Sequence, residues 1–191
     1  MKLGVFIGSF NPVHKGHIKI ANHLLKKDYI DKLLIIPTQN YWNKNNLINI
    51  QDRINMLKIF ENKKIIINTK DNNIKYTYNL LKKLEKEYQK DELYLIIGAD
   101  NILRFKEWKN YKKILKYNII IVNRNKININ IYLDKLGKKD KYIIVNDLKN
   151  IDISSSLIRK LIKENNLEKL QKIIDKKVLG YIKNKNLYKG E

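Results

Sequence analysis

Gly8-Ser9-Phe10-Asn11-Pro12-Val13-His14-Lys15-Gly16-His17 is the stretch that decides the fold of this chain. It follows the short apolar run Leu3–Ile7, which is typical of a buried strand, and precedes Ile18–Lys26, where apolar residues recur at helical spacing. A glycine turn between a strand and a helix is where α/β proteins hold phosphates, because backbone N–H groups and the helix N-terminus point at the anion. The Gly8–His17 turn therefore predicts an α/β fold with a nucleotide site.

Two histidines close this turn, and their spacing suggests shared chemistry. His14 and His17 are three residues apart, so on a helix both rings lie on one face and can meet one ligand. One interpretation is a zinc pair, but zinc usually needs a third ligand, and His23 is expected on the surface of the same helix. A second interpretation is a structural role, in capping the helix or filling a polar pocket. We favour a third, in which both rings donate to phosphate oxygens and stabilise the charge that develops in phosphoryl or nucleotidyl transfer.

A second candidate phosphate site is Ile153-Ser154-Ser155-Ser156-Leu157-Ile158-Arg159. The serines precede a helical pattern, where hydroxyls ordinarily cap free N–H groups, and on its own this segment would be interpreted as a helix cap. Arg159, however, falls three to four residues further on, on the side of Ser155 and Ser156. Two hydroxyls, a helix N-terminus and a guanidinium group together predict a polyphosphate receptor.

Strands and helices alternate along the chain. Six short runs are nearly all apolar and β-branched, as strands buried on both faces should be: Leu3–Ile7, Lys32–Ile36, Lys64–Asn68, Leu93–Ile97, Tyr117–Val122 and Tyr142–Val145. Helical periodicity marks seven segments: His17–Lys27, Ile50–Phe60, Thr77–Tyr88, Trp108–Leu115, Ser155–Asn165, Leu167–Ile174 and Lys177–Asn184. The alternation predicts a Rossmann-like, doubly wound parallel sheet that binds ligands at the carboxyl ends of its strands.

The domain organisation is simple. We expect one domain over residues 1–191, with 155–191 as a small C-terminal helical part. Polar loops are expected at 38–49 and at 123–141, the second of them lysine-rich and mobile.

Composition narrows the class of protein. The chain has no Cys, which excludes disulfides, thiolate catalysis and cysteine metal sites. No signal peptide is evident and no apolar run approaches the ~20 residues of a membrane span, so we expect a soluble, cytoplasmic protein without a membrane partner. The formal charge of +21 suits a nucleic-acid-binding protein, but the lysines are scattered over every segment, so we favour compositional drift and expect no nucleic-acid partner. A homo-oligomer remains open.

The two motifs together resemble those of a known family. Gly-x-Phe-x-Pro-x-His-x-Gly-His paired with Ile-Ser-Ser-(Ser/Thr)-x-x-Arg is similar to the signature of the nucleotidyltransferase superfamily of adenylyl- and cytidylyltransferases. Further motifs make the chain resemble bacterial nicotinate-nucleotide adenylyltransferases over nearly its whole length: Arg53-Ile54-Asn55-Met56-Leu57, Tyr76-Thr77, Ile96-Ile97-Gly98-Ala99-Asp100 followed by Trp108, and Val178-x-x-Tyr181-Ile182 with Leu187-Tyr188.

The resemblance implies adenylyl transfer from ATP to nicotinate mononucleotide, with Mg²⁺ carried on the ATP phosphates and no protein-held metal. The implied catalytic residues are His14, His17 and Arg159. The implied ATP-binding residues are Gly8, Ser9, Phe10, His17, Gly98, Asp100, Ser155, Ser156 and Arg159, and those for nicotinate mononucleotide are Asn11, Lys44, Tyr76, Thr77 and Trp108.

Each implied ligand has a physical reason and a structural alternative. Trp108 offers a flat face to a cationic pyridinium ring, or else fills the core. Thr77 and Tyr78 at a helix N-terminus offer N–H groups to a carboxylate, or else cap the helix. Asp100 suits ribose hydroxyls, or else caps the next helix.

The chain departs from the family pattern at two places. Tyr41-Trp42-Asn43-Lys44 stands where the family commonly has Pro-Pro-His-Lys, which should loosen this loop. Asn11 stands where bacterial members usually carry Asp, and Asn also occurs there in nicotinamide mononucleotide adenylyltransferases. Nicotinamide mononucleotide therefore remains the alternative substrate.

Overall fold

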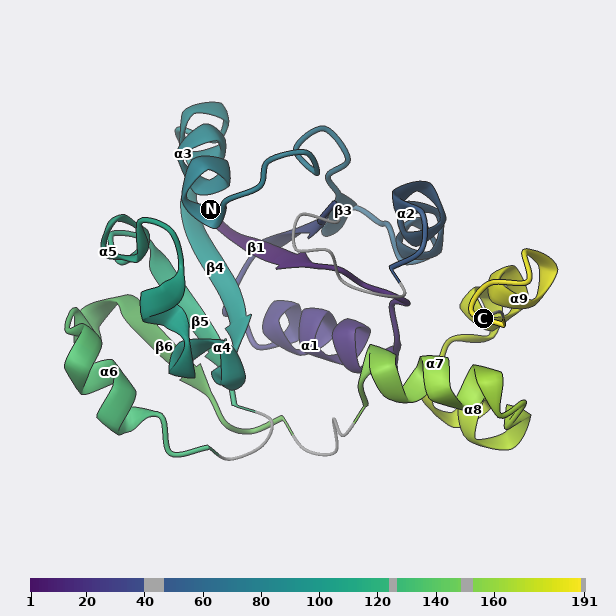
Figure 1. Cartoon of the computed structure of the whole chain (residues 1–191). Coiled ribbons are helices and arrows are strands. Elements are labelled where there is room, and N and C mark those ends of the chain that lie inside the picture. The colour runs from purple at the N-terminus through teal and green to yellow at the C-terminus, as the bar shows by residue number, and fades with distance from the viewer. Residues whose placement is uncertain (40–46, 124–126, 149–152, 190–191) are drawn as a thin grey trace.

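The structure is a computed structural model that describes residues 1–39, 47–123, 127–148 and 153–189. Its centre is a sheet of six parallel strands in the order β3-β2-β1-β4-β5-β6 (Figure 1). The strands are β1 (Lys2–Gly8), β2 (Lys32–Pro37), β3 (Ile65–Ile67), β4 (Glu92–Gly98), β5 (Asn118–Val122) and β6 (Tyr142–Val145). Each differs from its predicted run by no more than one residue at either end.

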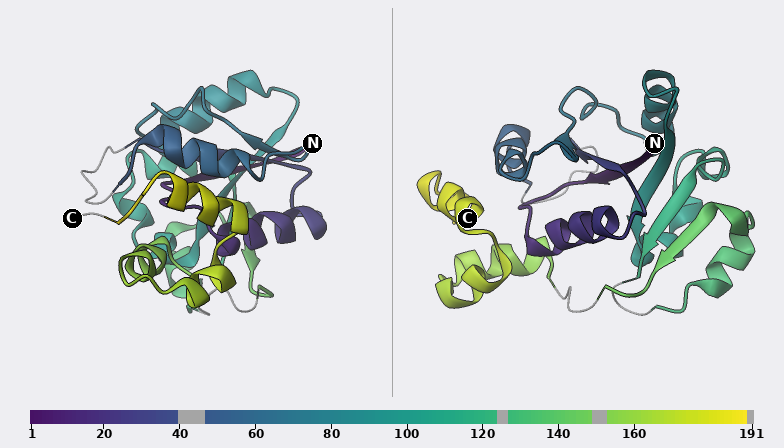
Figure 2. Two further views of the ribbon diagram at one scale, coloured as in Figure 1. Left: turned by 90° about the vertical axis from the view of Figure 1, so that its right-hand side faces the viewer. Right: turned by 180° about the vertical axis from the view of Figure 1, so that it is seen from behind.

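Helices cover both faces of this sheet (Figures 1 and 2). They are α1 (Lys15–Lys26), α2 (Ile50–Lys58), α3 (Thr77–Glu87), α4 (Ala99–Leu103), α5 (Tyr111–Ile114), α6 (Asn130–Leu136), α7 (Ser155–Lys163), α8 (Leu167–Ile173) and α9 (Lys176–Asn184). Successive residues of β2 enter opposite cores: Leu33 belongs to the core that also contains side chains of α1, α2 and α7–α9, and Leu34 to the core that contains side chains of α3–α6. The predicted doubly wound α/β fold with C-terminal helices is confirmed.

Two local predictions were wrong, and one helix was not predicted. The segment 123–141 is not simply a loop, because it contains α6, whose Leu133 is buried in the core below α3. The predicted helix Trp108–Leu115 shortens to α5, because Asn110 adopts the left-handed conformation (φ 57°) and Trp108 is extended. The five-residue helix α4, which directly follows β4, was not predicted.

The carboxyl edge of the sheet opens between β1 and β4. The two strands pair from Lys2 with Glu92 as far as Phe6 with Ile96. Beyond that point β1 continues beside β2 as far as Gly8, and β4 continues beside β5 as far as Gly98. This is the place where the strand order reverses, and in open α/β sheets the crevice at such a switch point is the ligand site.

The C-terminal helices lie beside the start of α1 and beside α2 (Figure 2). Lys15 Nζ donates to the last carbonyls of α8, Gln171 O at 2.8 Å and Lys172 O at 3.1 Å. The Tyr181 hydroxyl of α9 donates to Asp52 and accepts from Asn55, both on α2. The end of the chain is thereby held against the edge at which β1 ends.

Within the described ranges, no helix is long and apolar enough to cross a membrane.

Candidate functional site

The Gly8–His17 turn leaves β1 in an unusual backbone conformation. Phe10 has φ 46°, a left-handed value that costs an L-residue roughly 1–2 kcal/mol. Its buried ring packs edge-on against Phe6, with centroids 5.4 Å apart, and against His17 at 5.0 Å. A side chain at Gly8 would bring a Cβ within 3.1 Å of the Phe10 ring. Glycine at position 8 and the buried ring at position 10 therefore shape the turn together.

The two histidines lie together, as predicted. Their rings stack with centroids 3.7 Å apart and planes inclined by 29°. The His14 backbone N–H donates to His17 Nδ1 at 3.3 Å, so the structural interpretation as a helix cap also holds. Because Nδ1 accepts this bond, the neutral His17 ring carries its proton on Nε2. Nε2 of the neutral His17 ring is therefore a hydrogen-bond donor, not an acceptor.

His23 does not share their site. Its Nε2 lies 2.9 Å from the Asp147 carboxylate, and its side chain is partly exposed on the surface of α1. Among the described residues, no group of three or more His, Asp or Glu side chains could hold a metal ion.

The second motif docks directly onto the turn. The Ser155 hydroxyl donates to Pro12 O at 2.9 Å, and Arg159 Nη1 donates to Asn11 O at 2.8 Å. Arg159 Nη2 also donates to the Ser156 hydroxyl at 3.1 Å. The cap of α7 is Ser154, whose hydroxyl accepts from Leu157 N at 3.1 Å. The fold thus unites two motifs from opposite ends of the chain, and the N-terminus of α7 adds positive potential beside that of α1.

Arg53 of α2 is a buried cation behind this turn. Its Nη1 donates to Ser9 O at 2.7 Å and to Thr38 O at 2.8 Å, and its Nε donates to Ile48 O at 3.2 Å. These bonds tie together the chain segments that leave β1 and β2. Burial lowers the pKa of Arg53, but an arginine stays protonated near neutral pH. All three acceptors are neutral carbonyls, so the guanidinium keeps its positive charge beside the turn.

The side chain of Asn11 is a buried junction. Its Oδ1 accepts from the Tyr188 hydroxyl at 2.8 Å and from Ile48 N at 3.4 Å. Burial raises the pKa of the Tyr188 phenol, while the guanidinium groups of Arg159 and Arg53 act in the opposite direction. Tyr188 is therefore a neutral hydrogen-bond donor among the cationic groups of the site.

Gly98 and Asp100 face the turn from the end of β4. Gly98 occupies the N-cap position of α4, so the alternative in which Asp100 caps this helix is wrong. Asp100 lies in the first turn of α4 and is exposed. A side chain at position 98 would collide with the Asp100 carboxylate, so glycine is needed to leave that carboxylate where it is.

The aromatic residues gather further along the same edge. Tyr76 is the N-cap residue of α3 and Thr77 is its first residue, so the first N–H groups of α3 open beside them. Lys109 Nζ lies 4.5 Å from the centre of the Tyr76 ring, which brings the segment after α4 to the start of α3. Trp108 is half-buried, with its ring centroid 5.2 Å from that of the fully buried Phe105. Trp108 therefore rests partly on the core, as its structural alternative requires.

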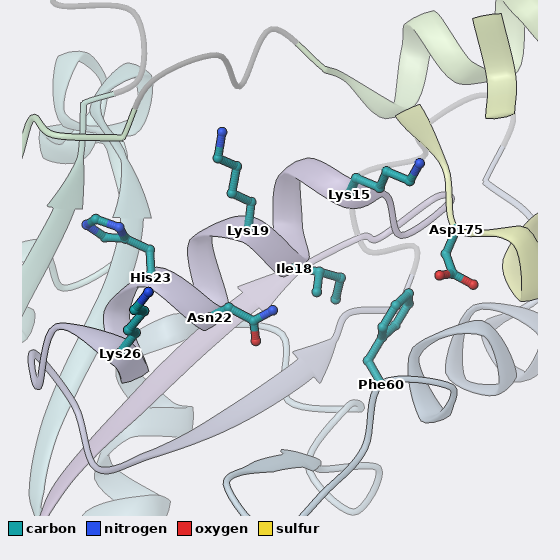
Figure 3. Close-up of a pocket in the computed structure, with 8 residues that line it drawn as sticks. All are labelled: Lys15, Ile18, Lys19, Asn22, His23, Lys26, Phe60 and Asp175. Carbon is teal, nitrogen blue, oxygen red and sulfur yellow. The ribbon is translucent and has the colours of Figure 1, made fainter. Parts of the chain in front are cut away.

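Some predicted features are not located by the structure, and one cavity lies elsewhere. Lys44, with Tyr41 and Trp42, falls outside the described residues. A shallow cavity of about 430 Å³ runs along the outer face of α1, and Figure 3 shows its basic side chains opposite Phe60 and Asp175. Its lining includes none of the predicted site residues.

Sequence reasoning missed what Arg53 and Tyr188 do. Both were quoted only as parts of family motifs. A signal for Arg53 was present, because it shares one helical stripe with Met56 and Leu57 and so had to be buried with them. Tyr188 is 177 residues from its partner Asn11, and no local pattern reveals such a pair.

The chain is similar to known proteins over most of its length. A family model described as cytidylyltransferase-like matches residues 5–161. A probable nicotinate-nucleotide adenylyltransferase of Fusobacterium nucleatum is 38% identical over 185 residues, which cover 93% of this chain and 95% of that protein. A protein of the same description from Borrelia garinii subsp. bavariensis is 36% identical over 196 residues, covering 98% of this chain and 95% of its own length.

Two solved structures share the fold over nearly the whole chain. Both are of the nicotinic acid mononucleotide adenylyltransferase of Plasmodium falciparum, one complexed with NaAD and the other with APC. Their TM-scores are 0.83 and 0.80, at 26% and 25% sequence identity. They cover 98% of this chain and 97% and 96% of their own chains.

Proposed function

The chain belongs to the cytidylyltransferase-like family and, within it, to the nicotinate-nucleotide adenylyltransferases. On that premise we propose that it makes deamido-NAD and pyrophosphate from ATP and nicotinate mononucleotide, which is a step of NAD biosynthesis. The observation that carries this proposal is the docking of Ser155 and Arg159 on the carbonyls of Pro12 and Asn11, at the switch point of the sheet. That docking gathers two helix N-termini, two histidines and a guanidinium group around one crevice, as a triphosphate requires.

The proposed reaction needs no side-chain nucleophile. The 5′-phosphate of nicotinate mononucleotide is already anionic, and one of its oxygens forms the new bond to the α-phosphorus of ATP. The bond from that phosphorus to the oxygen bridging to the β-phosphate breaks, and pyrophosphate leaves. Catalysis is then the positioning of two anions and the stabilisation of the charge that moves onto pyrophosphate.

The ATP end of the site follows from the Gly8–His17 turn. The N–H groups of Gly8, Ser9 and Phe10 cradle the transferring group, and His14 and His17 contact the α- and β-phosphates. His17 suits this role because its Nδ1 is engaged by the His14 backbone, which leaves Nε2–H as the donor. Arg159 with Ser155 and Ser156 receives the departing pyrophosphate, and Asp100 beside Gly98 accepts from the ribose hydroxyls.

The pyridine end lies toward α3. The Trp108 ring stacks on the cationic pyridinium, and the N-terminus of α3 at Tyr76 and Thr77 binds the nicotinate carboxylate. We also assign Asn11 to this end, and the family resemblance adds Lys44, which lies outside the described residues.

A divalent cation fits the site as a companion of ATP. The donors that the described residues supply are mainly cationic or neutral, and none forms a three-ligand cluster. Such a set suits Mg²⁺ held by phosphate oxygens and water, whose charge offsets that of the triphosphate. A reaction that consumes ATP also fits the cytoplasmic location expected from the sequence.

Pyrophosphate release tests this proposal. ATP is offered with nicotinate mononucleotide, nicotinamide mononucleotide or phosphopantetheine, and we expect the fastest release with nicotinate mononucleotide. The second candidate, a preference for nicotinamide mononucleotide, is favoured by Asn11 alone, and a higher rate with that substrate would establish it. No release with either pyridine mononucleotide refutes the proposed reaction.

A further inference from the structure

The last residues of the chain return to the Gly8–His17 turn. After α9, Asn186 and Tyr188 adopt left-handed conformations, with φ 49° and 65°, and Leu187 N donates to Ile182 O at 3.0 Å. This path turns the chain back across the end of α9. It delivers the Tyr188 side chain into the core, where the residue is only 9% exposed.

The Tyr188 hydroxyl does more than fill space. A phenylalanine would bury the same ring, whereas the hydroxyl reaches Asn11 Oδ1 at 2.8 Å inside the turn. The same oxygen accepts from the backbone N–H of Ile48, and the carbonyl of Ile48 accepts from Arg53 Nε. One amide oxygen therefore joins the turn, the segment before α2 and the C-terminus. The backbone N–H of Ile48 can only donate, so it selects the oxygen end of the Asn11 amide, and the Tyr188 hydroxyl donates to that same oxygen.

Asn11 is held twice, at two different atoms. Its backbone carbonyl accepts from Arg159 on the side proposed for ATP, and its side chain accepts from Tyr188. The carbonyl belongs to the turn, whose course is also set by Ser155 and Arg53. Loss of the Tyr188 hydroxyl therefore removes the shorter of the two hydrogen bonds to Asn11 Oδ1, the other being that from Ile48 N, and leaves the Arg159 contact in place.

We propose that Tyr188 is a positioning residue, which acts through Asn11 to set the site for nicotinate mononucleotide. This inference rests on the proposed function, in which Asn11 belongs to the pyridine end of the site. The C-terminal residues thus form part of the substrate site, although Tyr188 itself touches no substrate.

Tyr188→Phe tests the role of the hydroxyl while keeping the ring. We expect the KM for nicotinate mononucleotide to rise about ten-fold, as for the loss of one buried hydrogen bond, with the KM for ATP and kcat within about two-fold of the wild type. A merely structural role would instead lower the active fraction, and hence kcat, at unchanged KM values. Tyr181→Phe is the matched control, because it removes a phenol hydroxyl bonded to α2 and not to the turn.

A double-mutant cycle with Asn11→Ala identifies the route. If Tyr188 acts through Asn11, Tyr188→Phe adds less than about two-fold to the KM once Asn11 is alanine. An equal loss in both backgrounds, or no loss in the single variant, overturns the inference.

Calorimetric titration of nicotinate mononucleotide separates this inference from the proposed reaction, because it needs no turnover. Weaker binding by Tyr188→Phe than by wild type supports the positioning role. Equal dissociation constants refute it. A wild type that binds the mononucleotide but releases no pyrophosphate refutes the proposed reaction instead.

Discussion

Replacement of His17 by alanine is the sharpest probe of the proposed chemistry. The His14 N–H occupies Nδ1 of this ring, so the variant loses the Nε2–H donor that we assign to the phosphates. A single donor aimed at developing charge contributes about 10²–10³ in kcat, or ~3–4 kcal/mol. The variant also loses a capping hydrogen bond of α1, which lowers the free energy of unfolding by only ~1 kcal/mol. We therefore expect a large loss of rate in a protein that remains folded.

The assay is steady-state pyrophosphate release at saturating ATP and nicotinate mononucleotide, with a urea titration of each variant. His17→Gln retains an N–H group near the position of Nε2 and should give an intermediate rate. His23→Ala is the matched control, because His23 lies on the same helix but pairs with Asp147 away from the turn. Its rate should stay within about two-fold of the wild type.

The reasoning would be refuted by a His17→Ala protein that turns over within about three-fold of the wild type and binds both substrates normally. A rate loss equal to that of His23→Ala would refute it as well, since it would show a general effect of altering α1.

Three further outcomes follow from other contacts. Arg53→Met removes a buried hydrogen-bond donor from three carbonyls, so we expect the free energy of unfolding to fall by ~3 kcal/mol in a urea titration. An unchanged free energy of unfolding would mean that the cost of burying the guanidinium charge equals the stabilisation from its hydrogen bonds. Gly98→Ala pushes the Asp100 carboxylate aside, so the KM for ATP should rise about ten-fold while the KM for nicotinate mononucleotide stays constant. Burial raises the pKa of Tyr188, so the folded state holds the phenol proton more tightly than the unfolded chain does. Below pH 10.0, the ordinary pKa of tyrosine, both states keep this proton; above it the unfolded chain loses the proton first, and the free energy of unfolding falls. The unfolding free energy of the wild type should therefore fall more steeply above pH ~10 than that of Tyr188→Phe, by up to ~1.4 kcal/mol per pH unit, and parallel curves would contradict the burial of the phenol.

The strands were predictable because burial on both faces leaves a strong local signal. β2, for example, has four consecutive apolar residues, Leu33 to Ile36, that alternate between the two cores. The sequence signal of α6 is weak because few of its apolar residues are buried. Leu133 is buried but Ile131 is 56% exposed, so the apolar residues of α6 do not show a clear helical periodicity. Helices this short depend on tertiary packing rather than on their own sequence.

The sequence indicates which residue types the candidate site contains, but not how they are connected. The pairing of the Gly8–His17 turn with Ser155 and Arg159 could be inferred because both motifs carry phosphate-binding groups. The bonds of Arg53 to three carbonyls and of Tyr188 to Asn11 could not, since each joins segments whose proximity only the fold creates. The pairing of His23 with Asp147 could not be predicted for the same reason, because the two residues are 124 positions apart in sequence.

The bond between Tyr188 and Asn11 also has a consequence for how the protein is made. The two residues are 177 positions apart, so a ribosome adding roughly 5–20 residues per second makes the second about 10–35 s after the first. The glycine turn leaves the ribosome early, but it lacks Arg159 and Tyr188 until those residues have been made. A nascent or prematurely terminated chain can therefore form most of the sheet while its site is still unfinished. The site is complete only after Tyr188 has been made.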